Sequence, residues 1–273
     1  MIEQGIYKDL SSEAYHGDKT SFSRSSIKDF DRSPYYYYAM HLKEDRPTRL
    51  ATKDMLFGTA FHTLILEPFK FNDDYAIEPA KVLLKDVGRA IYDAAKAVEE
   101  ELKTSNKIIL SQDEYQTLMK MREALARDER IAQLIDGGDI EKSFFWKDEQ
   151  TGLMVKARPD IIHAGMIVDL KTIADASPFA FQRDMASGWY HVQGAMIRDA
   201  VRALEGFEIS TVINICVEKK YPYSIGIYII DEAALDQGES KYKSVLLQMK
   251  SCIINNKFAD FEIQHIGLPK WAI

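Results

Sequence analysis

Runs of apolar and β-branched residues, separated by turn-forming segments, predict β-strands in the second half of the chain. Residues 166–171 are apolar enough for a buried strand. The turn-like segment 148–152 separates two further runs and predicts a hairpin that leads into this strand. The predicted strands comprise residues 142–146, 153–158, 166–171, 211–217 and 224–230.

Capping signals predict helices on either side of these strands. Ser111 and Glu114 form a capping-box pattern before a run with helical apolar spacing, and Asp231 can cap a last helix extending towards residue 255. A further helix is predicted from Trp189 to about Glu205, and the N-terminal portion is expected to be helical. This order of elements predicts an α/β fold with a mixed central β-sheet flanked by helices.

Length and composition favour a single domain. With 273 residues, 46% of them hydrophobic, the chain can bury one substantial core, so we expect one domain over residues 1–273. No apolar run approaches the roughly 20 residues that span a bilayer, and the N-terminus has no basic, apolar signal peptide. We therefore expect a cytoplasmic protein without membrane contact.

Two carboxylates and a lysine occur around the predicted central strand. Asp169 and Lys171 are two residues apart on that strand, so their side chains point the same way, while Leu170 points into the core. Asp160 ends the preceding strand-like run, and residues 161–165 can turn back to form a hairpin that brings Asp160 beside Asp169. By itself, an Asp-x-Lys triplet is commonly no more than a structural salt bridge.

These residue types suit metal-assisted hydrolysis of a phosphodiester. Mg²⁺ prefers carboxylate, carbonyl and water oxygens and bridges to substrate phosphates. Asp160 and Asp169 can supply such ligands, with the backbone carbonyl of Leu170 as a third. The ion lowers the pKa of a bound water, and the ammonium of Lys171 can orient the nucleophile or hold the scissile phosphate.

This acidic pair with its lysine resembles the motif of the PD-(D/E)xK nuclease superfamily, whose restriction-endonuclease-like core the fold is expected to share. Residues 57–68 look like the helix that carries a metal-ligating histidine in RecB-type and RecE-type exonucleases, and His62 takes that place. Gly58 would leave room beside the imidazole on the same helix face. A core histidine is the alternative interpretation, and Glu67 is a weaker candidate ligand.

A glutamine on the next predicted helix matches a second motif of the RecB family. In that motif a tyrosine follows the glutamine by four residues, whereas here Ile197 follows Gln193. Tyr190 lies three residues before Gln193 and would share its helix face. We expect Gln193 to contact a phosphate or the catalytic lysine, whereas simple packing is at least as good an interpretation of Tyr190.

Residues 21–35 and 268–272 further resemble the C-terminal nuclease domain of RecE, the prophage exonuclease VIII. The resemblance covers nearly the whole chain and is weakest at about residues 80–109. It implies a Mg²⁺-dependent exonuclease, with Mn²⁺ as a substitute, that digests double-stranded DNA from its ends in the 5′ to 3′ direction. It also implies a ring-shaped homo-tetramer that leaves 3′ single strands for an annealing protein in DNA recombination.

The formal net charge of −7 opposes general DNA binding, because neutralising phosphates supplies most non-specific affinity. A positive electrostatic potential that attracts DNA must therefore be confined to one part of the surface. Lys156, Arg158 and Tyr190 are candidate DNA contacts near the proposed site, although solvated surface charge is the commoner explanation of such cations. The two cysteines are too few for the four-cysteine iron–sulfur cluster of some RecB-family nucleases.

Two alternatives stay open at this point. A structure-specific or restriction-type endonuclease of the same fold would use the same residues, and closed circular DNA would distinguish it from an exonuclease. A non-catalytic DNA-binding protein could also keep this scaffold, but the intact motif argues against it.

Overall fold

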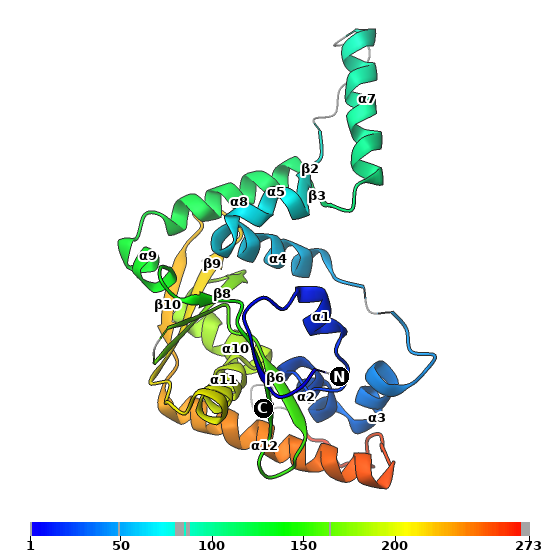
Figure 1. The fold of residues 1–273 in the computed structure, drawn as a ribbon, viewed down its shortest axis with the longest axis vertical. Helices are drawn as coiled ribbons and strands as arrows, with labels where there is room; N and C mark the ends of the chain where they lie inside the picture. Colours follow the sequence, from blue (N-terminus) through cyan, green and yellow to red (C-terminus); the bar gives the residue numbers. More distant parts are fainter. Residues whose placement is uncertain (1, 49, 80–84, 86–87, 164, 269–273) are drawn as a thin grey trace.

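A five-stranded mixed sheet forms the centre of the computed structural model (Figure 1). The structure describes residues 2–48, 50–79, 85, 88–163 and 165–268. The strand order is β10-β9-β8-β7-β4; β8 and β9 are parallel, and the other neighbours are antiparallel. The strands are β4 (Asp139–Ile140), β7 (Ile161–His163), β8 (Met166–Ile173), β9 (Thr211–Glu218) and β10 (Ile225–Ile229). The mixed sheet expected from the sequence is confirmed.

The sequence of β8 explains its central position, because both of its faces are buried in apolar cores. Val168 and Leu170 are fully buried in the cluster on one face, and Ile167 is fully buried in the cluster on the other. Asp169 and Lys171 alternate with these residues and share the face of Ile167. The two polar side chains are therefore carried on the most enclosed strand of the sheet.

Helices cover both faces of the sheet (Figure 1). The cluster that includes Leu170 contains apolar side chains of α4 (Lys53–Leu66) and α8 (Gln112–Leu125). The cluster that includes Ile167 contains side chains of α2 (Arg24–Arg32), α11 (Tyr190–Glu205) and α12 (Glu232–Asn255). The other helices are α1 (Ser12–Gly17), α3 (Pro34–Tyr37), the π-helix η1 (Tyr38–Leu42), α5 (Pro68–Asp74), α7 (Arg89–Thr104), α9 (Glu129–Ile135) and α10 (Pro178–Gly188).

The hairpin predicted upstream of the central strand forms, but it belongs to a separate sheet. β5 (Ser143–Lys147) and β6 (Met154–Ala157) pair antiparallel, and β1 (Gly5–Tyr7) pairs with β5 to give the order β1-β5-β6. The Asp148 carboxylate accepts a 2.8 Å hydrogen bond from the Thr151 N–H and closes the turn. The N-terminal strand completes this sheet and brings the start of the chain close to the residues that precede the site.

Capping residues set the helix boundaries much as predicted. Ser111 and Glu114 make both hydrogen bonds of the capping box at α8, and the Asp231 side chain caps α12. Helix α11 begins at Tyr190, one residue later than expected, because Trp189 has a left-handed backbone with φ of 63° and ends α10. The two helices therefore meet at a sharp corner next to the residues of the second motif.

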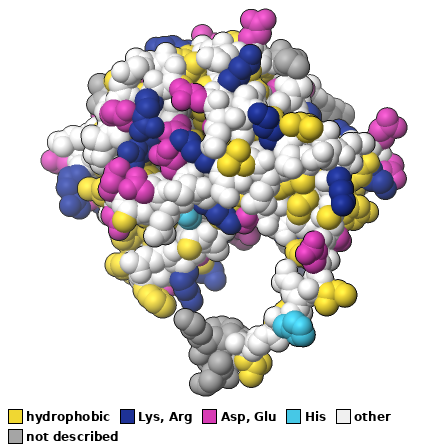
Figure 2. All heavy atoms as spheres, turned by 90° about the horizontal axis from the view of Figure 1, so that it is seen from below, with side chains coloured by type: hydrophobic (Ala, Val, Ile, Leu, Met, Phe, Trp, Pro, Cys, Tyr) yellow, Lys and Arg dark blue, Asp and Glu magenta, His cyan; other side chains and the backbone are white. Residues whose placement is uncertain are grey.

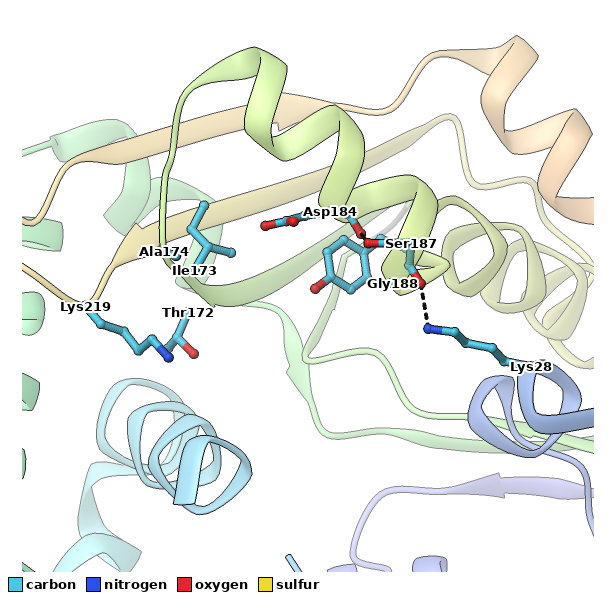
Figure 3. A pocket seen from close by; sticks show the side chains of 9 residues that line it. Lys28, Thr172, Ile173, Ala174, Asp184, Ser187, Gly188 and Lys219 are labelled. Carbon is cyan, nitrogen blue, oxygen red and sulfur yellow. Dashed lines mark hydrogen bonds between the residues drawn. The ribbon is translucent and has the colours of Figure 1, made fainter. Parts of the chain in front are cut away.

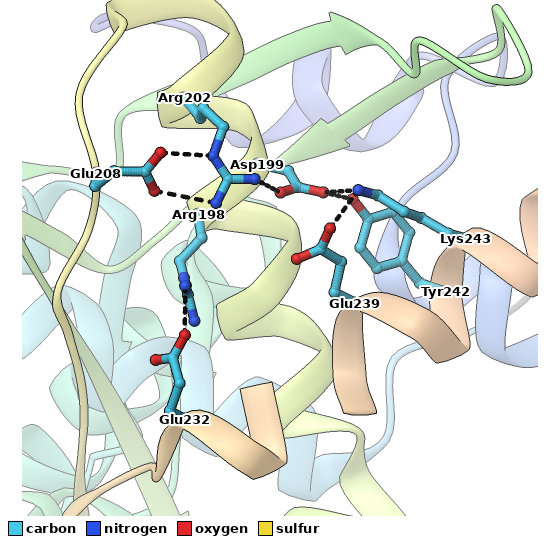
Figure 4. Close-up of polar contacts among 8 residues, drawn as sticks. All are labelled: Arg198, Asp199, Arg202, Glu208, Glu232, Glu239, Tyr242 and Lys243. Carbon is cyan, nitrogen blue, oxygen red and sulfur yellow. Dashed lines mark hydrogen bonds and ion pairs between the residues drawn. The ribbon is translucent and has the colours of Figure 1, made fainter. Parts of the chain in front are cut away.

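A buried carboxylate joins α11 to α12 (Figure 4). Asp199 is 7% exposed, and its oxygens accept hydrogen bonds from the Tyr242 hydroxyl and, at 2.8 Å, from the Arg202 guanidinium. The Lys243 ammonium lies 3.1 Å from the same carboxylate. Because these donors compensate the buried charge, the network holds α11, the helix of Gln193, in a fixed orientation.

Helix α7 projects from the body of the molecule (Figure 1). It follows β2 (Tyr75–Ile77) and precedes β3 (Ile108–Leu110), which pair in parallel as a small separate sheet. This projection coincides with the segment whose resemblance to the RecE nuclease domain is weakest. The part of that segment at residues 80–84 and 86–87 lies outside the described residues.

The surface carries no dominant charge on the face shown in Figure 2, where acidic and basic side chains are interspersed. None of the described helices combines the length and the apolarity that crossing a membrane requires. Of the C-terminal stretch that resembles RecE, residues 269–272 lie outside the described part of the chain.

Candidate active site

The β7–β8 hairpin brings the first motif together. β7 and β8 pair antiparallel, with Ile161 opposite Val168. Asp160 directly precedes β7 and therefore lies beside the residues that follow Val168 on β8. The Leu170 N–H donates a 2.7 Å hydrogen bond to Asp160 Oδ2. The predicted hairpin is confirmed, and Leu170 contacts Asp160 through its N–H, while its carbonyl stays a predicted metal ligand.

Asp169 and Lys171 form an ion pair on the same face of β8. Both side chains are largely buried, with 3% and 15% exposed. Burial and the neighbouring Asp160 charge raise the pKa of Asp169. Burial disfavours the charged form of Lys171, but the Asp169 and Asp160 carboxylates outweigh it and raise the pKa of the ammonium. The lysine is therefore held as a cation inside the protein.

His62 on α4 approaches the site from the other side of the hairpin. Its Nδ1 lies 3.4 Å from Asp160 Oδ1. Burial would raise the pKa of Asp160, but the His62 imidazole, the Lys171 ammonium and the N–H bond lower it to about 2. The structure thus favours the site interpretation of His62 over a plain core histidine.

Gly58 lies against β8 and not directly beside the imidazole. A Cβ placed on this glycine would meet the Thr172 hydroxyl of β8 at 3.7 Å, which is an ordinary contact distance. Gly58 therefore faces β8, where a Cβ would also fit, and the His62 imidazole is not among the atoms within 4 Å of that position.

Glu141 is a site residue that no sequence motif indicated. It follows β4 with a left-handed backbone, φ of 51°, and its N–H donates a 3.0 Å hydrogen bond to the Asp160 carbonyl. Ligand atoms of His62, Glu141 and Asp160 all lie within 4.8 Å of one another. Burial and the Asp160 charge raise the pKa of Glu141 to about 7, although Arg158 opposes the shift. Only the pairing of the two-residue strand β4 with β7 brings this carboxylate to the site.

This grouping changes the expected metal ligands. Asp160 combines with His62 and Glu141, whereas Asp169 is occupied by Lys171 and by Gln193. Glu67, the weaker candidate, forms an ion pair with Lys70 of α5. Asp169 and the Leu170 carbonyl remain predicted ligands.

Gln193 connects the central strand to the N-terminal helix. Its Nε2 donates a 3.0 Å hydrogen bond to Asp169, and its Oε1 accepts a 2.9 Å bond from Arg24 of α2. Tyr190, one turn earlier, has the Lys171 ammonium 5.0 Å and the Arg24 guanidinium 5.8 Å from its ring centroid. Gln193 therefore contacts the acid of the motif, and Tyr190 contacts the lysine as an aromatic neighbour.

The position of the missing motif tyrosine is apolar. Ile197 is 1% exposed and lines a small cavity with Asp169, Gln193 and Asn214. Asn214 lies opposite Asp169 in the β8–β9 register, and its Oδ1 has no hydrogen-bond partner among the described residues. Tyr190 also lines this cavity, and its ring contacts the Lys171 ammonium.

Two of the candidate DNA contacts are engaged inside the protein. Lys156 is 4% exposed, and its ammonium donates to the carbonyls of Tyr15 and Asp18 at 2.6 and 2.7 Å. Arg158 donates a 2.8 Å bond to the Leu10 carbonyl. Because both cations hold the N-terminal segment, this geometry argues against either of them as a DNA contact.

Comparison with known proteins agrees with this fold. Residues 23–260 match the family described as a PDDEXK-like domain of unknown function (DUF3799). A crystal structure of a "Putative exonuclease" from Eubacterium rectale superposes with a TM-score of 0.61 and 18% identity, covering 94% of this chain and 96% of that chain. No curated protein matches the chain. At this identity the structural likeness shows the fold alone. Because the family match spans most of the sequence, the chain belongs to the PDDEXK-like domain family and has the fold of PD-(D/E)xK nucleases.

Proposed function

We propose that the protein is a divalent-metal-dependent nuclease that removes nucleotides from the ends of linear double-stranded DNA in the 5′ to 3′ direction. The observation that carries the proposal is the buried set of Asp160, Asp169 and Lys171 beside His62 on this fold. Burying several charges in one site is costly, and shifted pKa values gather where chemistry needs them. Burying these charges would add little to the stability of the fold if the cluster had only a structural role.

The donor set fits a hard divalent cation. His62, Glu141 and Asp160 supply one imidazole nitrogen and carboxylate oxygens, and carboxylates suit Mg²⁺ and Mn²⁺. We propose Asp169 and the Leu170 carbonyl as further ligands. A bound ion would supply a water of lowered pKa and neutralise charge on the scissile phosphate.

The chain's own residues supply positioning and charge. Lys171 is held between the Asp169 carboxylate and the Tyr190 ring. If the Asp169 carboxylate served as a metal ligand, the Lys171 ammonium would no longer be paired with it. The ammonium could then bind the scissile phosphate or orient the attacking water. Gln193 holds Asp169 by a hydrogen bond and so fixes the carboxylate that these two roles share.

The preference for DNA ends rests on the resemblance to RecE, and the similar crystal structure carries the description of an exonuclease. We also propose the assembly that the resemblance implies: a ring-shaped homo-tetramer that passes 3′ single strands to an annealing protein during recombination in the cytoplasm. An endonuclease with the same site would not need free ends.

Digestion of linear duplex DNA labelled separately at its 5′ and 3′ ends tests the proposal. With Mg²⁺, the wild-type protein should release label from the 5′ end first, and EDTA should prevent release. Closed circular duplex should stay intact. Cutting of circles would establish the endonuclease alternative, and binding without cleavage in Mg²⁺ or Mn²⁺ would establish the non-catalytic one.

A further inference from the structure

One arginine connects the N-terminal segment to the proposed metal site. Arg158 lies two residues before Asp160, and its Nη1 is 3.7 Å from Oε2 of Glu141. Glu141 is the carboxylate that groups with His62 and Asp160, with ligand atoms of all three within 4.8 Å of one another. The Arg158 side chain is only 9% exposed. A largely buried cation therefore borders a candidate metal ligand.

The other parts of the Arg158 guanidinium have fixed partners. Its Nε donates a 2.7 Å hydrogen bond to Ser143 Oγ, and its Nη2 donates a 2.8 Å bond to the Leu10 carbonyl. Its central carbon lies 4.2 Å from the ring centroid of Tyr15, on α1. Ser143 and Tyr15 are both buried. Because the guanidinium is planar and rigid, these contacts fix the direction in which its remaining nitrogen points towards Glu141.

The Glu141 side chain stands to gain from such a neighbour. The backbone of Glu141 is fixed by the hydrogen bond from its N–H to the Asp160 carbonyl, but its side chain has several rotatable bonds. Ordering a glutamate side chain costs conformational entropy. A neighbour that orders the side chain before the ion binds lowers the cost of binding. Residues that hold metal ligands in place in this way typically change metal affinity ten-fold or more.

Arg158 does not face the pocket beside the proposed site. That pocket, of about 500 Å³, is lined by residues of α2 and α10 and by the end of β8, among them Thr172 and Asp184 (Figure 3). Neither Arg158 nor Glu141 is among its lining residues. The effect of Arg158 on the site is therefore exerted through Glu141 and not through contact with a molecule in this pocket.

We propose that Arg158 is a positioning residue that holds the Glu141 carboxylate in place for a divalent cation. The N-terminal segment, residues 10–15, then takes part in the metal site by holding Arg158, although it contributes no ligand. The inference rests on the metal site of the proposed function, but it does not require cleavage of DNA.

A double-mutant cycle on Arg158 and Glu141, measured by isothermal titration calorimetry with Mn²⁺, tests the assignment. Arg158→Lys keeps the positive charge, and so its repulsion of the ion, but one ammonium cannot replace the planar fork. In the wild-type protein this change should weaken Mn²⁺ binding about ten-fold. In Glu141→Ala it should have no further effect. Arg130→Lys, at an exposed arginine of α9, is the matched control and should bind Mn²⁺ as the wild type does.

A milder variant keeps the test open if Arg158→Lys does not fold. Ser143→Ala removes one acceptor that holds the guanidinium, so it should also weaken Mn²⁺ binding, and again not in Glu141→Ala. Lys147→Ala, which removes an exposed lysine of the same strand, β5, is its control and should leave Mn²⁺ affinity unchanged.

Two results would overturn the proposal. One is unchanged Mn²⁺ affinity in folded Arg158→Lys. The other is an equal loss of affinity in the wild-type and Glu141→Ala backgrounds, because a general structural defect does not depend on Glu141.

The cycle also separates this inference from the proposed function. Mn²⁺ binding that is lost in Asp160→Ala, together with an equal effect of Arg158→Lys in both backgrounds, would reject the role of Arg158 alone. Mn²⁺ binding that neither Asp160→Ala nor Glu141→Ala weakens would reject the metal site and the role of Arg158 with it. The expected cycle in a protein that cuts no DNA under any metal would reject the nuclease function alone.

Discussion

At the scale of single residues, the site is a chain of compensated charges. His62 lowers the pKa of the Asp160 carboxylate, and the Asp169 carboxylate raises the pKa of the Lys171 ammonium. Burial and the Asp160 charge act the other way on two carboxyls: they raise the pKa of Asp169, and they raise that of Glu141 to about 7. A carboxylate whose charged form is disfavoured in the folded protein is stabilised when a cation binds beside it.

Glu141→Gln should therefore weaken binding of Mn²⁺ by about ten-fold or more, because it removes a charged ligand while preserving shape. Isothermal titration calorimetry of Mn²⁺ measures this. Glu149→Gln changes an exposed acid in the β5–β6 turn and is the matched control. Unchanged Mn²⁺ affinity in Glu141→Gln would remove this residue from the metal site.

The same substitution should stabilise the protein without metal, and the gain should depend on pH. The pKa of Glu141 is near 4.5 ordinarily and about 7 in the folded protein, so the folded state binds more protons between these values. Its contribution to stability is then lost as pH rises from about 4.5 through 7. Relative to wild type, Glu141→Gln should gain about 1–3 kcal/mol above pH 7 and nearly nothing at pH 4.

Urea unfolding in EDTA at pH 4, 6 and 8 measures this difference. Glu149→Gln serves again as the control. A Glu141→Gln gain that is constant across pH, or a loss at pH 8, would contradict the assigned shift.

At the scale of elements, two sets of contacts fix the orientation of α11. Gln193, near its start, binds Asp169 of the site, and Asp199, further along the helix, binds Tyr242 of α12. Tyr242→Phe removes one donor to that buried carboxylate and keeps the ring (Figure 4). We expect the free energy of unfolding to fall by about 1–3 kcal/mol, since the buried carboxylate loses one of its three donors. Urea denaturation measures this change. Tyr221→Phe, at a tyrosine 88% exposed, should change it little; equal effects of the two variants would exclude a special role for the network.

The elements could be predicted from the sequence because their signals are local. Apolar runs and caps gave β8, β9, α8 and α12, and the spacing of Asp160 to Lys171 gave the hairpin of the site. Glu141 could not be predicted, since its position depends on a two-residue strand and a left-handed backbone. The buried contacts of Lys156 and Arg158 could not be predicted from the sequence either. Their partners are backbone carbonyls of the N-terminal segment, which is distant in the sequence.

At the scale of the whole molecule, two apolar cores share one sheet. One cluster contains Ile167 and the other contains Val168, adjacent residues of β8. Because neither core can lose its packing without exposing this strand, we expect one cooperative unfolding transition, as the single-domain prediction also requires. Fluorescence of Trp146 and Trp189, both in the first cluster, should follow the same urea curve as far-UV circular dichroism. Two separated transitions would contradict a single domain.

The central claim is that Lys171 acts in metal-dependent DNA hydrolysis at this buried site. Its most direct test compares initial rates of digestion of linear duplex DNA by wild type, Lys171→Ala and Lys147→Ala at saturating Mg²⁺, with thermal unfolding measured in parallel. The account predicts that Lys171→Ala loses about 100-fold or more of its rate while remaining folded, and that Lys147→Ala keeps the wild-type rate. A folded Lys171→Ala protein that digests DNA at nearly the wild-type rate would contradict it.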